Sequence, residues 1–206
     1  DLLGVPASRI RVVPHGVHLP AVLPPVQREP LVLHVGAIQT RKNLVRLVSA
    51  FERAAPPPWR LVLAGGEGYG AREALDRIRS SPAATRIEVT GWLPDEEIER
   101  LYWRASILAF PSLDEGFGIP ALEAMAHGVP VLSSRRSALP EVCGDAAVLV
   151  DPLREDEIAE ALAVMIQDES LRGKLAAAGR ARAAEFPWSR TVEETWNSYR
   201  ELGAVV

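Results

Sequence analysis

Two glutamates separated by seven residues, Glu115 and Glu123, are the side chains that point most directly to chemistry. Pro120 suits the first turn of a helix, so we expect Glu123 inside that helix, pointing back toward Glu115. Two converging carboxylates without a metal partner suit a hydroxyl-rich ligand, because carboxylates accept strong hydrogen bonds from hydroxyl groups. In the alternative, Glu123 only caps helix N–H groups and Glu115 is a surface residue. The apolar Ala124–Ala126 that follows favours a real partner for Glu123, since burial of an unpaired charge is costly.

A pair of cations, Arg41 and Lys42, precedes another expected helix. The chain leaves a strand through Gly36, and Asn43 is the expected N-cap residue of the helix that begins at Leu44. Cations beside a helix N-terminus oppose the helix dipole, so they cost stability unless an anion lies between them and the free N–H groups. Two explanations stay open at this point: a phosphate-bearing ligand, or a pair of cations that is simply solvated in a loop.

A third loop, Gly65–Gly70, holds four glycines in six residues between a buried strand and a helix. Its spacing does not match the G-x-G-x-x-G fingerprint of dinucleotide-binding proteins. The loop indicates either a tight turn or a close approach of the backbone to a nucleotide.

These loops follow short apolar runs that we predict to be buried strands. The predicted strands are Ile10–Val13, Leu31–Val35, Leu61–Ala64, Ile87–Val89, Ile107–Phe110, Val129–Leu132 and Ala147–Val150. The segments between most of them carry apolar residues at helical spacing, and such alternation indicates a parallel sheet covered on both faces. The predicted fold is therefore α/β, a Rossmann-like doubly wound parallel sheet, in which ligands bind at the carboxyl ends of the strands.

After Val150 the pattern changes to a helical C-terminal tail. We predict three helices there, at Glu155–Ile166, Leu171–Ala184 and Ser189–Leu202. Three aromatic residues at its end, Trp188, Trp196 and Tyr199, fit either the core or an interface with another domain. Residues 1–30 are rich in proline, and we expect them to form a linker that includes the first strand. We expect residues 31–206 to form the ligand-binding domain, and the chain to be part of a longer protein.

The composition excludes several classes of function. A formal charge of −4, from 23 basic and 27 acidic residues, gives no overall reason to bind nucleic acid or an anionic bilayer. A single cysteine, Cys143, cannot form an internal disulfide, which favours a reducing compartment, and the cytoplasm is the expected location. The four histidines lack metal-ligand spacing, so we expect no metal. No apolar run approaches the roughly 18 residues of a membrane span.

Several stretches, in this order along the chain, resemble the carboxyl-terminal half of a retaining, mannosyltransferase-like nucleotide-sugar glycosyltransferase of family 4. That family has the GT-B fold, of which this chain would be one Rossmann-like lobe. The stretches are Arg41–Leu44, Gly91–Glu97, Pro111–Ser112 with Glu115–Pro120 and Glu123–Ala126, and Leu139–Val142. The similarity runs from about Arg11 to Leu202, and the two glutamates are its most specific element.

The resemblance implies a role for each candidate residue. Glu115 would face the hydroxyls of the donor sugar and Arg41 with Lys42 would grip the diphosphate, which makes these three the catalytic residues. Glu123 would hold the ribose hydroxyls. The remaining donor-binding positions would be the backbone around Gly116, Phe117 and Gly118, the base pocket at Gly91, Trp92 and Leu93, and the strand-end glycines Gly36 and Gly65. The donor would be a nucleoside-diphosphate sugar, with no metal or other cofactor.

Three departures from the family pattern bear on these roles. Ala37 stands where many members carry an arginine after the glycine matched by Gly36, and Arg41 would supply the charge instead. His15–His18 replaces the family's Asn-Gly-Val-Asp junction, which puts a hinge role there in doubt. The family's amino-terminal acceptor domain, with its catalytic histidine, has no counterpart in these residues.

The resemblance therefore implies the donor-binding half of an enzyme of polysaccharide biosynthesis. The whole enzyme would transfer a hexose, with mannose from GDP-mannose as one candidate, to a glycan or lipid-linked acceptor. The partners would be the donor, the absent amino-terminal domain and the acceptor, and nucleic acid would not be among them. Any contact with the inner face of the membrane would be made by the rest of the enzyme. The isolated domain is expected to be inactive. The alternatives are a stand-alone nucleotide-sugar-binding or regulatory module, and a GT-B sugar-nucleotide epimerase, which would need its own acid and base.

Overall fold

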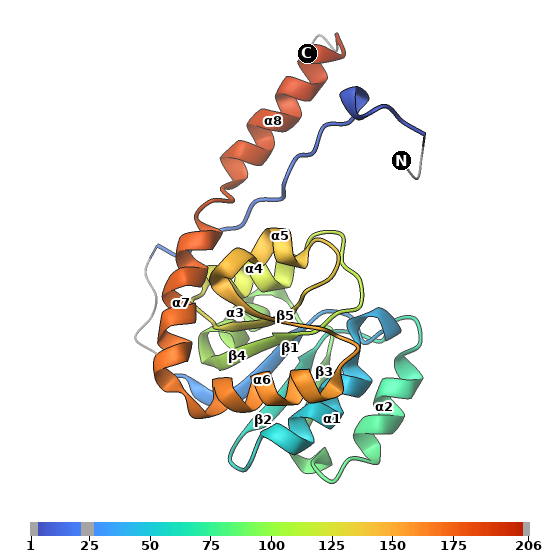
Figure 1. Ribbon diagram of the computed structural model, residues 1–206, viewed down its shortest axis with the longest axis vertical. Coiled ribbons are helices and arrows are strands. Elements are labelled where there is room, and N and C mark those ends of the chain that lie inside the picture. The colour runs from blue at the N-terminus through green and yellow to red at the C-terminus, as the bar shows by residue number, and fades with distance from the viewer. Residues whose placement is uncertain (1–3, 22–26, 204–206) are drawn as a thin grey trace.

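The computed structural model describes residues 4–21 and 27–203, and these residues form a six-stranded sheet with helices on both faces (Figure 1). The strands are β1 (Glu29–Val35), β2 (Arg60–Ala64), β3 (Ile87–Gly91), β4 (Ala105–Phe110), β5 (Val131–Ser134) and β6 (Ala147–Val150). Every neighbouring pair is parallel, and the order across the sheet is β3-β2-β1-β4-β5-β6. The prediction of a Rossmann-like doubly wound parallel sheet is confirmed.

The strand order reverses between β1 and β4. In doubly wound sheets of this order, the crevice at the carboxyl ends of the two strands beside the reversal is where ligands bind. The loops that leave β1 and β4 are those that carry Arg41, Lys42 and Glu115. The topology therefore brings residues about 70 positions apart in the sequence to one edge of the sheet.

Helices of α and 3₁₀ type connect the strands. The α-helices are α1 (Leu44–Ala54), α2 (Ala71–Arg79), α3 (Asp95–Arg104), α4 (Ile119–Ala126), α5 (Leu139–Cys143), α6 (Glu155–Gln167), α7 (Glu169–Ala183) and α8 (Trp188–Glu201). Single 3₁₀ turns occupy η1 (Ala7–Arg9), η2 (Thr40–Lys42), η3 (Ala84–Arg86) and η4 (Gly144–Ala146). The three tail helices of the prediction, which are α6, α7 and α8, are confirmed. None of the described helices combines the length and the apolar character that a membrane span requires.

Two hydrophobic clusters lie on opposite faces of the sheet, because successive strand residues point to opposite sides. Val32 of β1 packs in the cluster formed with α1, α2 and α6. Its neighbours Leu31 and Leu33 pack in the cluster formed with α3, α4 and α5. The central strands are buried from both sides, which explains why their sequences are apolar throughout.

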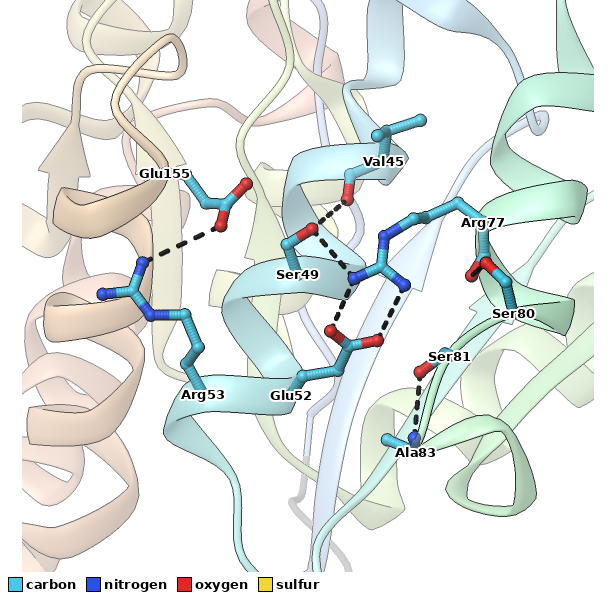
Figure 2. Close-up of polar contacts among 9 residues, drawn as sticks. All are labelled: Val45, Ser49, Glu52, Arg53, Arg77, Ser80, Ser81, Ala83 and Glu155. Carbon is cyan, nitrogen blue, oxygen red and sulfur yellow. Dashed lines mark hydrogen bonds and ion pairs between the residues drawn. The ribbon is translucent and has the colours of Figure 1, made fainter.

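Helix α1 shows how the sequence builds such a layer. Its apolar residues Leu44, Leu47, Val48 and Phe51 recur at helical spacing and are fully buried against the sheet. Its polar side contacts the two neighbouring helices (Figure 2). Arg77 of α2 donates hydrogen bonds to Glu52 Oε1 at 2.8 Å and to Ser49 Oγ at 3.1 Å. Arg53 pairs with Asp156 at 2.6 Å and Glu155 at 3.7 Å at the start of α6.

The amino-terminal segment and α8 lie side by side, away from the sheet (Figure 1). The N–H of Val17 donates to the carbonyl of Phe186 at 2.8 Å, and the Thr191 hydroxyl donates to the carbonyl of Pro14 at 2.8 Å. Arg11 forms an ion pair with Glu201 at 2.9 Å. No residue of α8 is buried among the described residues, so this helix is not part of the core.

Two strand predictions need correction. Ile10–Val13 is not a strand, because Ile10 and Val12 are exposed and this segment runs along α8 instead of beside a sheet edge. The fifth core strand begins at Val131 instead of Val129, because the N–H of Val129 donates to the carbonyl of Ala124 and closes the end of α4. The first strand of the sheet begins at Glu29, two residues before the predicted Leu31.

Candidate functional site

The loops that leave β1 and β4 are bound to each other through their backbones. The N–H of Leu113 donates to the carbonyl of Arg41 at 2.7 Å, and the Arg41 guanidinium donates to the carbonyl of Asp114 at 3.0 Å. These contacts fix the position of each loop relative to the other, and with it the position of the charged side chains. They form because the strand reversal places the ends of β1 and β4 side by side.

Arg41, Lys42 and Glu115 form one ion cluster at this edge of the sheet. Lys42 Nζ lies 2.6 Å from Glu115 Oε1, and Arg41 Nη1 lies 2.7 Å from Glu115 Oε2. The side chains of Lys42 and Glu115 are 5% and 7% exposed, while that of Arg41 is 45% exposed. The Lys42 ammonium also lies 4.4 Å from the centre of the Phe110 ring. The structure therefore brings together the three residues predicted to be catalytic.

Burial and charge act in opposite directions on this cluster. Burial alone would raise the pKa of Glu115, but the hydrogen bonds from Lys42 and Arg41 outweigh it, so that pKa is lowered. Burial lowers the pKa of Lys42, and the attraction of Glu115 opposes this shift. The pair is stable as an ion pair because each group supplies the charge that its partner needs.

Asn43 holds the cation loop against two neighbouring loops. It occupies the position before α1, as predicted, but in the left-handed conformation with φ of 61° and without a side-chain cap. Its amide donates instead to the carbonyls of Pro111 at 3.0 Å and Pro152 at 2.7 Å. The prediction of a capping side chain is wrong, because the oxygen that would accept from the helix N–H groups accepts from Arg46 Nη1 at 2.9 Å instead.

Three strand-end glycines, Gly36, Gly65 and Gly91, let the loops after β1, β2 and β3 pack together. A Cβ atom on Gly65 would lie 2.1 Å from the carbonyl oxygen of Gly36, and Gly65 forms a bridge with Gly91. A Cβ atom on Gly36 would lie 3.0 Å from Lys42 Cε. The close approach of the two backbones explains why position 65 needs a glycine, and the absence of a side chain at Gly36 leaves room for the Lys42 side chain.

The loop before α4 presents free backbone donors. Within the described ranges, the N–H groups of Gly116, Phe117 and Gly118 have no hydrogen-bond acceptor. A Cβ atom on Gly116 would meet nothing within 4 Å, so this stretch is open to a ligand. The Phe117 ring packs edge-on against His15, with 5.2 Å between ring centres, and does not extend into that space. Free N–H groups beside a helix N-terminus are suited to an anion.

Glu123 has different partners from Glu115. Its Oε2 accepts a hydrogen bond from the Tyr102 hydroxyl at 3.0 Å, and burial raises the pKa of its carboxyl. It lines a cavity of about 470 Å³ between α3, α4, residues 16–20 and Trp188. Neither Lys42 nor Glu115 lines this cavity. We expected Glu123 to point toward Glu115, but the two carboxylates do not line the same cavity.

The predicted base-pocket loop is exposed at the end of β3. The Trp92 side chain is 78% exposed, and a Cβ atom on Gly66 would lie 3.9 Å from it, so this loop lies beside the glycine-rich loop after β2. Leu93 packs against the core cluster on the α3 side of the sheet. Trp92 thus presents a large flat ring at the same edge of the sheet as the ion cluster.

Sequence reasoning missed three residues near the site. Tyr102 reads as an apolar helix position, and only its hydroxyl contact reveals its role. His34 is buried in β1, where Nδ1 bonds the carbonyl of Ala109 at 3.0 Å while Nε2 has no partner among the described residues. Ser137 has an unusual positive φ of 54° and donates to the Asp114 carboxylate, which steadies the loop before Glu115. A histidine inside an apolar strand was the one visible signal among these.

The remaining candidate groups have structural contacts. His127 Nδ1 bonds the carbonyl of Glu123 at 2.8 Å, as expected for a residue at the end of a helix. Burial raises the pKa of the Cys143 thiol to about 11, which makes it a poor nucleophile. In the part of the chain that the structure describes, no three His, Cys, Asp or Glu side chains are grouped to hold a metal.

Comparisons with known proteins bear on the family and the fold of this chain. Residues 19–182 match the family described as glycosyl transferases group 1. The O-antigen chain mannosyltransferase B of Escherichia coli is 36% identical over 174 residues, covering 82% of this chain and 45% of that protein. A D-inositol 3-phosphate glycosyltransferase of Nocardiopsis dassonvillei is 33% identical over 224 residues, covering 98% of this chain and 52% of that protein.

The same fold is present in solved structures. Sucrose-phosphate synthase from Thermosynechococcus elongatus matches with a TM-score of 0.78 and 28% identity, over 85% of this chain and 46% of that one. This chain therefore spans about half the length of the relatives that it matches. The fold, the order of the motifs and the family match lead to one conclusion: this chain belongs to the glycosyl transferases group 1 family.

Proposed function

We propose that this chain is the donor-binding half of a retaining glycosyltransferase that uses a nucleoside-diphosphate sugar. The observation that carries the proposal is the cluster of Arg41, Lys42 and Glu115 at the strand reversal. It combines two cations with the open N–H groups before α4, at the place where doubly wound sheets bind their ligands. The mannosyltransferase relative supports a hexose, with mannose from GDP-mannose as the candidate donor.

Departure of the diphosphate is the step that these cations would assist. As the bond between sugar and phosphate breaks, negative charge grows on the leaving oxygens. Groups already in place, Arg41, Lys42 and the N–H groups at Gly116–Gly118, stabilise that charge most when it is fully developed. Because two cations supply the neutralising charge, we propose that donor binding needs no metal ion.

The two carboxylates would recognise the hydroxyls of the donor. Glu115 would accept from the sugar, and Glu123, with its raised pKa and its single contact to Tyr102, would accept from the ribose. The exposed ring of Trp92 would stack on the base. Each of these side chains is positioned by the fold at the carboxyl ends of the strands, where a ligand is expected.

The acceptor would bind elsewhere in the longer enzyme. This chain spans about half of its relatives, so we propose that a second lobe, absent here, binds a glycan or lipid-linked acceptor. The buried, unpaired Cys143 fits a reducing compartment, and we place the reaction in the cytoplasm. The isolated chain should then bind its donor without turning it over.

Calorimetric titration with GDP, UDP, ADP and their sugars, each with and without EDTA, tests this proposal. We expect one nucleoside diphosphate to bind regardless of EDTA, and Lys42→Ala to weaken it on the order of a hundredfold, since a buried charged partner is lost. Guanosine or uridine, which lack phosphate, should bind the variant and the original chain equally. Lys174→Ala, which removes the only other lysine from an exposed position on α7, is the control. Equal losses for nucleoside and diphosphate would overturn the phosphate role.

A further inference from the structure

Both carboxylate oxygens of Glu115 form ion pairs with Lys42 and Arg41, the two cations that would bind the diphosphate in the proposed function. One oxygen contacts Lys42 at 2.6 Å and the other contacts Arg41 at 2.7 Å. We propose that Glu115 is a resident counter-ion, which the diphosphate of the donor must displace before this carboxylate can accept from the sugar. The inference rests on the proposed function and goes beyond it, because it makes one residue serve two ligand groups in a fixed order.

Burial explains why a counter-ion is needed in the free protein. The Lys42 side chain is 5% exposed and lies between Gly36 and the ring of Phe110. An ammonium removed from water in this way is strongly destabilised unless an anion accompanies it. Glu115 supplies that anion, so the cationic corner stays folded and charged before any ligand arrives.

The charges favour exchange once a diphosphate arrives. Two cations face one carboxylate, so the cluster carries an excess positive charge with Glu115 in place. A diphosphate offers more negative charge and more acceptor oxygens than a single carboxylate, and it can also use the free N–H groups at Gly116–Gly118. A neutral sugar or a nucleoside offers none of this charge and cannot displace Glu115.

The surroundings of the cluster determine which side chain moves. Lys42 is enclosed by Gly36 and Phe110, whereas Gly116, next to Glu115, faces open space. The backbone of Asp114 is held by Arg41 Nη1 at 3.0 Å, and its carboxylate accepts from Ser137. The Glu115 side chain can therefore rotate away from a fixed loop while Lys42 keeps its position for the phosphate.

Titration of Glu115→Gln with inorganic pyrophosphate and with GDP tests this inference. Gln keeps the shape of the side chain and removes the competing charge. We expect pyrophosphate and GDP to bind the variant about tenfold more tightly than the original chain, as loss of an opposing ion pair of moderate strength would give. The gain from adding the sugar to GDP should disappear, because the carboxylate that accepts from the sugar is gone.

Glu52→Gln is the matched control. It makes the same change in a half-buried Glu–Arg pair, with Arg77 Nη1 2.8 Å from Glu52 Oε1, on the part of α1 that faces α2 (Figure 2). We expect its pyrophosphate affinity to equal that of the original chain. Glu115→Asp is the second variant, for the case that Gln prevents folding. The shortened carboxylate reaches one cation less well, so pyrophosphate should again bind more tightly.

The outcomes separate this inference from the proposed function. If the original chain binds neither pyrophosphate nor any nucleoside diphosphate, the proposed function fails and the inference fails with it. If the original chain binds them and the folded Glu115 variants bind pyrophosphate equally or more weakly, only the counter-ion role is overturned. Tighter binding by Glu115→Gln, together with unchanged binding by Glu52→Gln, supports it.

Discussion

His34 is a neutral group held in the most charged part of the molecule. Its ring stacks on Phe110, with 5.6 Å between ring centres, and the Lys42 ammonium lies over that same Phe110 ring. Burial lowers the pKa of His34 from 6.5 to about 4. The imidazole therefore stays uncharged beside Lys42 and adds no third positive charge to the two that Glu115 already faces.

This burial predicts a loss of stability in mild acid. Between pH 6.5 and about 4, the unfolded chain gains a proton on His34 that the folded chain does not bind, so stability falls as pH falls through that window. The shift corresponds to about 3 kcal/mol over the whole window. His34→Asn places an amide N–H near the position of Nδ1, which bonds Ala109, and cannot titrate, so urea denaturation at pH 7.5 and pH 4 should show that much less acid sensitivity. Identical acid sensitivity in the two proteins would contradict the prediction.

The types of the site residues were predictable from sequence, but their pairing was not. The sequence singled out Arg41, Lys42 and Glu115 because they are charged residues in glycine-containing loops at the ends of strands, where parallel sheets bind ligands. The ion pairs of Glu115 with Arg41 and Lys42 depend on side-chain positions to within a few ångströms. The spacing of residues in a sequence does not specify positions that closely. Tyr102 escaped notice because it follows Leu101 on the apolar face of a helix, and its hydroxyl becomes visible only beside Glu123.

At the scale of elements, contact between the loops after β1 and β2 decides where glycine is required. We expect Gly65→Ala to destabilise the chain by about 2 kcal/mol or more, because its methyl group would overlap the carbonyl of Gly36. Gly173→Ala is the control, since a Cβ there meets nothing within 4 Å and the residue lies inside α7. It should leave stability unchanged or raise it by up to about 1 kcal/mol. Urea denaturation of both variants measures the difference, and similar midpoints would refute the packing argument.

The elements themselves were largely predictable, because buried parallel strands leave a strong apolar pattern. The errors arose where a local pattern depended on a distant partner. Ile10–Val13 has the composition of a strand but no sheet edge beside it, and Val129 is buried in the core although its N–H bonds the end of α4 instead of a strand. The order of the strands, which brings the two loops of the site together, follows from tertiary contacts that local periodicity does not encode.

At the scale of the whole molecule, α8 carries an apolar face that the rest of the described chain leaves uncovered. Trp188 and Trp196 are each 40% exposed, Tyr199 is 50% exposed and Val192 is 54% exposed. The core interpretation of Trp196 and Tyr199 is therefore wrong, and the interface interpretation stays a prediction. An exposed face of this kind contributes little to the stability of the chain that carries it.

We therefore expect Trp196→Ser combined with Tyr199→Ser to change the free energy of unfolding by less than about 0.5 kcal/mol. The reason is that the two residues are 40% and 50% exposed and their rings pack edge-on against each other, with 6.0 Å between ring centres. Urea denaturation of the double variant and of the original chain checks this prediction. A stability loss comparable to that of a core substitution would show that α8 belongs to the folding unit of the sheet.

The amide of Asn43 has a consequence for how the protein ages. This one side chain donates to the carbonyls of Pro111 and Pro152, so it joins the loops that follow β1, β4 and β6. Slow hydrolysis during storage would turn the amide into a carboxylate, which can only accept and would repel both oxygens. The loop after β6 would lose its hydrogen bond to the other two loops, and an old sample would have a distorted candidate site with every charged residue of the ion cluster chemically intact.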